Sequence, residues 1–378
     1  MHDNELHRHL IGADDARDRF NTPVLCIDLD ALDRNIAAMA RFARACGVRL
    51  RPHAKTHKCV AIALRQIAAG AIGQCCAKLG EAEVLAAGGV HDLLITSPVV
   101  SVPAIERLST LCRSIRRLAV VIDHPDNVEA LDAAMNGTTL DVFIDIDPGS
   151  RRTGVTSAAA ALELSGHIQR ASNLKFAGVQ FYCGPQQHIA SFAARRAAIV
   201  DRIDYLKQVL AAFNARGIHV PMITGAGTGT HRIDADLGVF TEWQVGSYAF
   251  MDREYADCEL TPEPATAFEH ALFVEARVIS ANTRGVATVD AGLKAFACDA
   301  GSPTIASGAP PGTTYRFMGD EHGMIVDPEG SHEWRLGDLV RFVVPHCDPT
   351  VNLYDTYHVL RGARLEAIWS IDGRGCSR

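Results

Sequence analysis

The sequence is poor in lysine. Lysine occurs at six positions only, while the basic residues number 37: Lys55, Lys58, Lys78, Lys175, Lys207 and Lys294. Against 44 acidic residues this leaves a formal charge of −7, and no dense basic block occurs. A nucleic-acid-binding surface is therefore not expected. Because arginine supplies most of the positive charge, each lysine deserves examination for a chemical role.

Long apolar runs and a cysteine framework are also absent. Runs such as residues 118–122 have the length of a strand and cannot cross a membrane. The 11 cysteines are odd in number and lack the spacing of a disulfide-rich secreted domain. Residues 1–5 are polar, without the charged-then-apolar layout of a signal peptide. We expect a reduced, cytoplasmic protein without a membrane partner.

The first two thirds of the chain alternate strand-like and helical patterns. The expected strands are residues 24–29, 49–52, 73–77, 92–97, 118–123, 140–147, 176–182, 222–225 and 243–246. Helical periodicity lies between them, for example at residues 31–46, 60–69, 81–87 and 192–216. This alternation indicates βαβ units and a parallel sheet. Eight or nine strands in such a stretch favour a closed (β/α)8 barrel over an open sheet.

The pattern changes near residue 268. Short alternating or β-branched runs follow, at residues 272–280, 285–290, 315–318, 324–326, 339–344, 354–360 and 364–371. Turn signals separate them, which is typical of an antiparallel β-domain. The predicted fold is therefore α/β, with a barrel at residues 22–255 and a β-domain at residues 256–378. The boundary lies in the polar segment 252–265, and residues 1–21 are candidates to pack with the β-domain.

Lys55 lies where catalytic groups of a barrel are found, at the C-terminal end of a strand. The exit of the second expected strand, residues 51–58, reads RPHAKTHK and holds two of the six lysines. A lysine that is partly desolvated beside other cations has a lowered pKa and can attack a carbonyl group. A solvated basic loop that binds an anion or nothing is the alternative.

A glycine-rich exit follows a later strand. Residues 224–230 read TGAGTGT, and residues 246–248 (GSY) leave the next strand. Backbone N–H groups of such loops hold phosphate in the late strands of barrels. The spacing is neither a Walker loop nor a dinucleotide fingerprint, so tight turns made for packing are the alternative.

Two further exits carry polar side chains. Residues 145–154 contain Arg152, and residues 180–188 contain Tyr182 and His188. Each exit alone is compatible with an ordinary surface loop. Their succession around one barrel end favours an active site.

The β-domain contains a candidate metal pair. Residues 343–350 (VVPHCDPT) end an apolar strand, and on an extended chain His346 and Asp348 face the same way while Cys347 faces away. One imidazole and one carboxylate, with positions left for water and substrate, suit Mg²⁺ or Mn²⁺ better than a closed zinc site. A surface turn is the alternative.

Together these segments resemble the D-threonine aldolases of the alanine-racemase-like (fold-type III) pyridoxal phosphate enzymes. The shared stretches are residues 51–58, 75–83 (CCAKLGEAE), 178–188, 224–229, 242–252 (EWQVGSYAFMD), 289–294 (VDAGLK), 320–323 (DEHG) and 346–352 (HCDPTVN). They span the chain from about residue 22 to its end. The family's barrel and β-domain agree with the independent pattern above.

The resemblance implies roles for individual residues. Lys55 would bind pyridoxal 5'-phosphate covalently, and His188 would lie near the substrate hydroxyl. Arg152 is similar to the arginine beside the cofactor ring, and Tyr182 to a tyrosine of the cofactor pocket. The implied phosphate-holding residues are Thr224, Gly225, Gly227, Thr228, Gly246, Ser247 and Tyr248.

The metal pair distinguishes two branches of the resemblance. His346 and Asp348 would bind a divalent ion, with Mn²⁺ or Mg²⁺ favoured over Zn²⁺. The sister D-serine dehydratases typically have cysteine where this chain has Asp348, so the carboxylate favours an aldolase. Cys347 is adjacent, and a shifted strand could present its sulfur instead.

The implied activity is metal-activated, pyridoxal-phosphate-dependent retro-aldol cleavage of D-3-hydroxy amino acids of the D-threonine type to glycine and an aldehyde. Dehydration of D-serine or another D-3-hydroxy amino acid to a 2-oxo acid and ammonia is one alternative. A 3-hydroxy-D-aspartate aldolase is another. A non-enzymatic cofactor carrier is the third, and the added β-domain argues against it. The resemblance also implies a head-to-tail homodimer.

Overall fold

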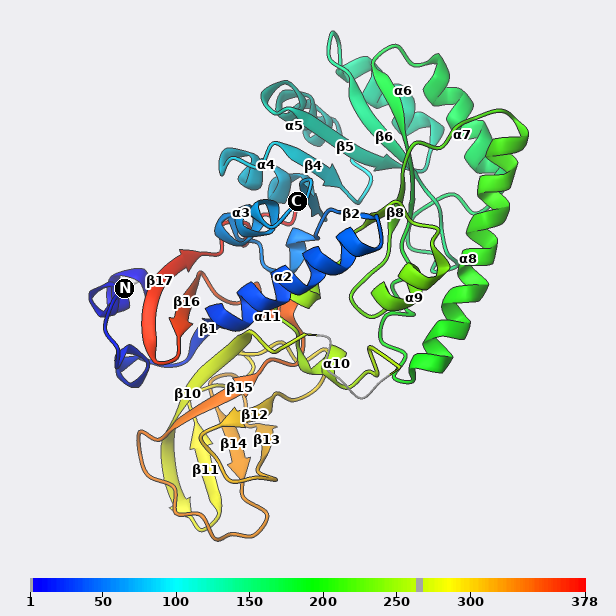
Figure 1. Ribbon diagram of the computed structural model, residues 1–378. Helices are drawn as coiled ribbons and strands as arrows, with labels where there is room; N and C mark the ends of the chain where they lie inside the picture. Colours follow the sequence, from blue (N-terminus) through cyan, green and yellow to red (C-terminus); the bar gives the residue numbers. More distant parts are fainter. Residues whose placement is uncertain (1–2, 263–267) are drawn as a thin grey trace.

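The chain has an α/β barrel at one end and a mainly antiparallel sheet at the other. Figure 1 shows the computed structural model, which describes residues 3–262 and 268–378. The predicted fold class, a (β/α)8 barrel followed by a β-domain, is confirmed. Within the described residues, none of the helices combines the length and apolar character needed to span a bilayer.

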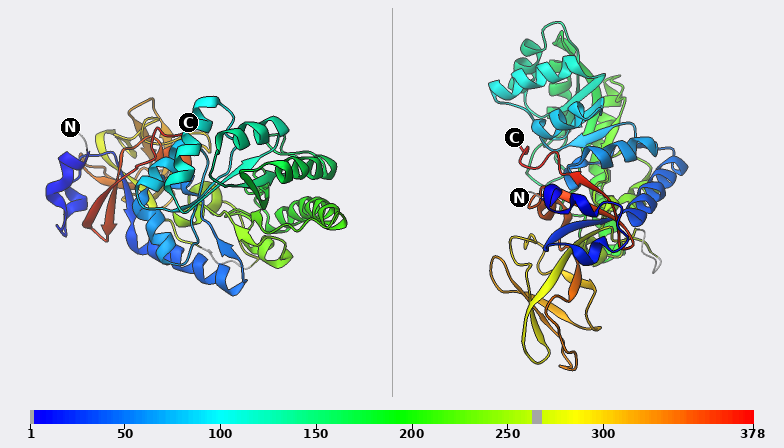
Figure 2. Two further views of the ribbon diagram at one scale, coloured as in Figure 1. Left: turned by 90° about the horizontal axis from the view of Figure 1, so that it is seen from above. Right: turned by 90° about the vertical axis from the view of Figure 1, so that its left-hand side faces the viewer.

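Eight parallel strands form the barrel, in the order β2-β9-β8-β7-β6-β5-β4-β3. A parallel bridge between His53 and Cys75 joins the two ends of this order and closes the ring. The strands are β2 (Arg49–Leu50), β3 (Gln74–Cys76), β4 (Asp92–Ile95), β5 (Arg117–Ile122), β6 (Leu140–Asp145), β7 (Leu174–Phe181), β8 (Ile223–Gly225) and β9 (Glu242–Trp243). In the left view of Figure 2 the helices surround these strands.

The barrel helices lie between successive strands. They are α2 (Leu29–Ala45), α3 (Val60–Ala68), α4 (Leu79–Ala87), α5 (Val102–Ser114), α6 (Pro125–Ala134), α7 (Ala158–Arg170), α8 (Phe192–Ala215) and α9 (His231–Leu237). α2 begins where the Asp28 carboxylate accepts a hydrogen bond from the Ala31 N–H. After α8 the chain turns at Gly217, whose φ of 67° suits glycine. These local signals explain why the predicted helices at residues 31–46 and 192–216 are correct.

Both faces of the barrel strands are covered, so the strands read as continuous apolar runs. β5 has the sequence RLAVVI, and its last five residues are buried. Alternate strand residues pack together as a separate apolar cluster: Cys75, Leu94, Ala119, Val121, Phe143, Ala177 and Met222. This cluster fills part of the barrel interior, as side chains do in this architecture. Catalytic groups are therefore confined to the rim.

The second sheet has nine strands. Its main order is β13-β14-β11-β10-β1-β16-β17, and β15 pairs with both β10 and β12. The strands are β1 (Val24–Asp28), β10 (Leu272–Thr283), β11 (Val286–Val289), β12 (Thr304–Ser307), β13 (Thr314–Phe317), β14 (Gly323–Val326), β15 (Leu339–Val343), β16 (Thr356–Arg361) and β17 (Arg364–Ser370). Short helices complete the fold: α1 (Asp3–His7), α10 (Arg253–Ala256) and α11 (Cys347–Val351).

The prediction that residues 24–29 form a barrel strand is wrong. β1 pairs antiparallel with β10 and parallel with β16, so it belongs to the second sheet. The segment 51–58 consequently follows the first barrel strand, not the second. A five-residue apolar run fits either sheet, and only its pairing partners decide between them.

The N-terminal segment packs on the second sheet. Arg17 Nε lies 2.8 Å from the buried Glu275 Oε1 of β10. His7 Nδ1 lies 2.8 Å from His358 Nε2 of β16. The proposed domain limits stay a prediction, and residues 263–265 of the predicted boundary lie outside the described residues.

Candidate active site

Lys55 lies in a 3₁₀ turn (Ala54–Thr56) that directly follows the exit of β2. Its side chain lines a cavity of about 540 Å³. The cavity is bounded by groups from most of the strand exits, including Lys78 and Thr96 after β3 and β4, Arg152 and Thr153 after β6, Tyr182 after β7, and the loops after β8 and β9. The polar exits predicted from the sequence therefore meet in one cavity.

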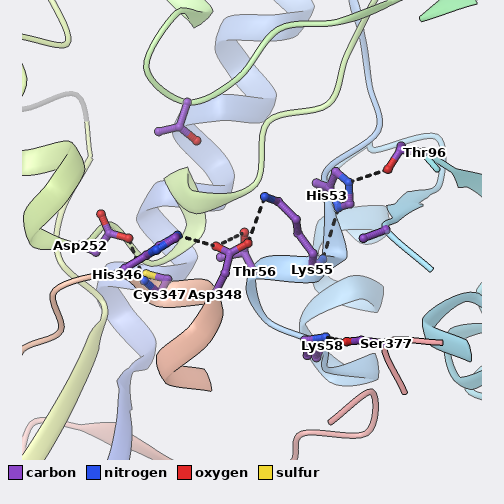
Figure 3. Close-up of polar contacts among 12 residues, drawn as sticks. His53, Lys55, Thr56, Lys58, Thr96, Asp252, His346, Cys347, Asp348 and Ser377 are labelled. Carbon is purple, nitrogen blue, oxygen red and sulfur yellow. Dashed lines mark hydrogen bonds and ion pairs between the residues drawn. The ribbon is translucent and has the colours of Figure 1, made fainter. Parts of the chain in front are cut away.

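An ion pair orients the Lys55 amine. Its Nζ lies 3.2 Å from Asp348 Oδ1, which belongs to α11 (Figure 3). The Asp348 charge raises the pKa of Lys55 above its ordinary value, and this effect outweighs the lowering by burial. The expectation of a lowered lysine pKa is wrong, because the charge of Asp348, a residue distant in sequence, has a larger effect than burial or the positive charge of Arg152.

Lys58 has a different environment. Its ammonium is buried, with Nζ 2.5 Å from Glu81 Oε1 and 2.9 Å from Ser377 Oγ of the C-terminal tail. The backbone at Lys58 has a φ of 49°, and its carbonyl accepts the N–H of Gly373. Lys58 thus ties the active-site turn to α4 and the chain end, so that of the two lysines in residues 51–58 Lys55 is the one that lines the cavity.

His53 supports the turn beneath Lys55. Its Nδ1 accepts the backbone N–H of Lys55 at 3.3 Å, and its Nε2 lies 3.0 Å from Thr96 Oγ1. Burial, and next the Lys55 charge, lower the pKa of His53 to about 3. The ring is therefore neutral, with its proton on Nε2, and donates to Thr96.

Seven of the predicted cofactor-binding residues line the cavity: Lys55, Arg152, Tyr182, Gly227, Thr228, Gly246 and Ser247. The Arg152 guanidinium lies over the Tyr182 ring, 5.5 Å from its centroid. Thr228 and Gly246 add backbone N–H groups that donate to no other described residue. Free donors of this kind on adjacent loops suit a phosphate group.

The other three predicted cofactor-binding residues do not line the cavity but lie behind the residues that do. The Thr224 hydroxyl donates to Glu242 Oε1 at 2.8 Å. A Cβ at Gly225 would lie 2.1 Å from the Phe181 carbonyl oxygen, so close strand packing explains this glycine. Tyr248 is fully buried, and its hydroxyl accepts a hydrogen bond from Gln66. These three residues therefore support the loops that line the cavity.

The predicted metal pair converges at the start of α11. His346 Nε2 lies 3.8 Å from Asp348 Oδ2 (Figure 3). The chain is helical here rather than extended, so the expected strand geometry is wrong although both side chains face one point. Cys347 is buried, its backbone N–H donates to Asp252 and its thiol to the Met251 carbonyl. The sulfur therefore faces away from the pair.

Opposing effects set the pKa values of this pair. Burial raises the pKa of Asp348, but the charges of Lys55 and His346 lower it below its ordinary value. Burial lowers the pKa of His346, but Asp348 and the hydrogen bond to Asp299 raise it overall. No group of three or more His, Cys, Asp or Glu side chains in the described part of the chain is arranged to hold a metal ion. Any ion here would have two protein ligands and several positions for water or substrate.

Two carboxylates at this site were not predicted. Asp299 Oδ2 accepts a hydrogen bond from His346 Nδ1 at 2.6 Å. Glu254 Oε1 lies 3.4 Å from Nδ1 of the predicted base, His188. From the sequence, Glu254 falls in the predicted domain boundary and Asp299 falls in a loop. The polar run at residues 252–257 was the only sequence feature that pointed to either acid.

His188 is half-buried beside the cavity. Its ring packs against Tyr255, which lines the cavity, with 4.5 Å between ring centroids. Burial lowers the pKa of His188, and the nearby Glu254 charge partly opposes this. The imidazole is therefore neutral near pH 7 and able to accept a proton.

The chain is similar in sequence to known families and proteins. Residues 27–254 match the alanine racemase N-terminal domain, and residues 271–360 match the putative serine dehydratase domain. The chain is 38% identical to the 3-hydroxy-D-aspartate aldolase of Paracoccus denitrificans (strain Pd 1222), with 97% of this chain and 95% of the relative covered. It is 38% identical to the D-threonine aldolase of an Arthrobacter species, with coverages of 95% and 94%.

A solved structure of a D-threonine aldolase also matches the fold of this chain. The D-threonine aldolase of Filomicrobium marinum has a TM-score of 0.90 and 40% identity, covering 96% of this chain and 97% of its own. The resemblance stated from the motifs is thereby confirmed, as is the predicted class of carbon–carbon lyases at the level of the family. The chain belongs to the alanine-racemase-like pyridoxal phosphate enzymes, in the group of aldolases whose barrel is followed by a serine dehydratase-like domain.

Proposed function

We propose that the chain cleaves D-3-hydroxy amino acids to glycine and an aldehyde, with pyridoxal phosphate and a divalent metal ion. One observation carries the proposal: Lys55, Asp348 and His346 converge at the cavity. The lysine amine lies 3.2 Å from one carboxylate oxygen, and the imidazole lies 3.8 Å from the other. An amine for a carbonyl cofactor thus adjoins a hard-ion ligand pair.

The cavity residues fit pyridoxal phosphate. Lys55 would bind it covalently, the free N–H groups of Thr228 and Gly246 would hold its phosphate, and Arg152 and Tyr182 would lie along its ring. When bound, this cofactor acts as an electron sink for the carbanion left by cleavage of the Cα–Cβ bond. Lys55 bound in this way would no longer pair with Asp348, and that carboxylate would then be available to a cation.

The metal pair fits a hard divalent ion. The Nδ1 proton of His346 is donated to Asp299, so in the neutral imidazole Nε2 would be free to act as a ligand beside the Asp348 carboxylate. Mixed nitrogen and oxygen ligation with open positions suits Mn²⁺ or Mg²⁺. An ion held there would lower the pKa of a bound hydroxyl group.

His188 is the base in this proposal. Its Nδ1 faces Glu254, so its Nε2 would accept the proton from the 3-hydroxyl group of the substrate. That proton loss converts the hydroxyl carbon to the aldehyde as the Cα–Cβ bond breaks. The electron pair left at Cα then takes up one proton to give glycine, and this proton balances the one lost from the 3-hydroxyl group.

The product assay tests the reaction. With D-threonine and Mn²⁺ the enzyme should release glycine and acetaldehyde in equal amounts, and Lys55→Ala should release neither. A dehydratase would instead form 2-oxobutanoate and ammonia, and that outcome would sink the aldolase proposal. Chelation should stop cleavage while the cofactor stays bound, so unchanged turnover would contradict the metal role of His346 and Asp348.

The position of one lysine favours 3-hydroxy-D-aspartate as a second substrate. Lys78 lines the cavity, and its ammonium has no acidic partner among the described residues. It could bind the side-chain carboxylate of 3-hydroxy-D-aspartate. If so, Lys78→Gln should lower kcat/KM for that substrate alone. An equal loss with D-threonine would assign Lys78 to the carboxylate on Cα that both substrates share.

We further propose a cytoplasmic homodimer. All eleven cysteines are free, and seven of them are buried, which suits a reducing compartment. Sedimentation of the purified protein should give about twice the mass of the 40.7 kDa chain. A fully active monomer at low concentration would contradict the dimer.

A further inference from the structure

Two carboxylates lie near the Nδ1 atom of His346, and Asp299 is the nearer of them. Its Oδ2 lies 2.6 Å from Nδ1, whereas Glu254 Oε2 lies 3.9 Å from the same atom. A neutral imidazole has one proton, and only the shorter distance is a hydrogen bond. The carboxylate accepts, so in the neutral ring the single proton belongs to Nδ1 and not to Nε2.

We infer that Asp299 is a positioning residue for the metal site, because its carboxylate keeps the proton of His346 on Nδ1 and turns Nε2 toward Asp348. The inference rests on the proposed metal pair. A metal-binding histidine needs an unprotonated ring nitrogen, and a carboxylate at the other nitrogen both selects this tautomer and increases ligand basicity.

The loop that carries Asp299 is anchored on both sides. The N–H of Ala297 donates to Thr350 Oγ1 in α11 at 3.2 Å, and the Arg253 guanidinium donates to the Ala300 carbonyl. α11 also carries Asp348, so the loop and the metal pair are held in one frame. The carboxylate of Asp299 is 54% exposed, so its replacement disturbs no core packing.

The test measures Mn²⁺ binding to the cofactor-loaded enzyme by electron paramagnetic resonance, without substrate. Asp299→Asn keeps the size of the side chain and removes its charge. We expect its Kd for Mn²⁺ to rise about 10–100-fold, the usual effect of losing such a partner. Asp299→Glu should recover part of the affinity. The cofactor absorption spectrum should stay unchanged.

Glu321→Gln is the matched control. Glu321 is a similarly exposed β-domain carboxylate that pairs with Lys294, and it does not contact His346. Its loss should leave the Kd for Mn²⁺ unchanged, so a general effect of charge is separated from orientation of the ring.

His346→Ala separates the two possible failures. If it abolishes Mn²⁺ binding while Asp299→Asn binds as tightly as the parent, the inference is overturned and the metal pair stands. If His346→Ala also binds Mn²⁺ unchanged, the proposed metal pair is wrong and the inference fails with it. If Asp299→Asn binds Mn²⁺ more weakly and His346→Ala does not bind it, both the inference and the proposed metal pair are supported.

Discussion

Lys58 and Lys55 lie three positions apart, and the structure predicts opposite consequences for their replacement. Lys58 and Glu81 form a buried ion pair, with side chains 7% and 5% exposed. Removing one member of such a pair costs about 3–5 kcal/mol, because the other charge stays buried. Glu81 Oε2 keeps the N–H groups of Ala77 and Lys78, so we expect Lys58→Met near the lower end, about 3 kcal/mol.

Lys55→Ala should behave differently. The Lys55 side chain is 42% exposed, and a partly exposed ion pair contributes about 1 kcal/mol or less. Its replacement should leave stability nearly unchanged and abolish covalent attachment of the cofactor. Lys58→Met should lower stability and retain that attachment.

Two assays check this contrast. Urea denaturation followed by tryptophan fluorescence gives the change in unfolding free energy. Borohydride reduction followed by peptide mass analysis identifies the lysine that carries the cofactor. The double variant Lys58→Met/Glu81→Gln should lose less stability than the sum of the single variants, because the unpaired charge is removed with its partner. Unchanged stability of Lys58→Met, or cofactor attached to Lys58, would refute the reasoning.

Three further predictions concern burial, metal choice and packing. Burial raises the pKa of Asp234 to about 7, while the Thr230 hydroxyl opposes this, so the folded state keeps a proton that the unfolded state loses near pH 4. Parent stability relative to Asp234→Asn should therefore fall by about 2 kcal/mol from pH 5 to pH 7, and parallel stability curves would contradict the shift. Asp348→Cys should move metal preference from Mn²⁺ toward Zn²⁺ in competition dialysis, and an unchanged preference would argue against its role as a ligand. A Cβ at Gly246 would lie 2.7 Å from Thr56 Oγ1, so Gly246→Ala should weaken cofactor binding in absorbance titrations; unaltered affinity would show that this loop does not hold the phosphate.

Local patterns along the chain were enough to predict much of this protein. Apolar runs, helix periodicity and the glycine after α8 depend on residues close in sequence, so strands β2 to β9 and the main helices could be anticipated. The position of Lys55 at a strand exit follows from the same local order. The motif set, spread over nearly the whole chain, was enough to name the family.

Tertiary structure alone decided the rest. β1 pairs with the second sheet because β10 and β16 offer edges there, and no pattern within five residues encodes that choice. The raised pKa of Lys55 depends on Asp348, which the fold brings from the other domain. Asp299 acts, in our inference, through a hydrogen bond across 47 positions. Electrostatic energies depend on distance in space and on burial, and a sequence specifies neither until the chain has folded.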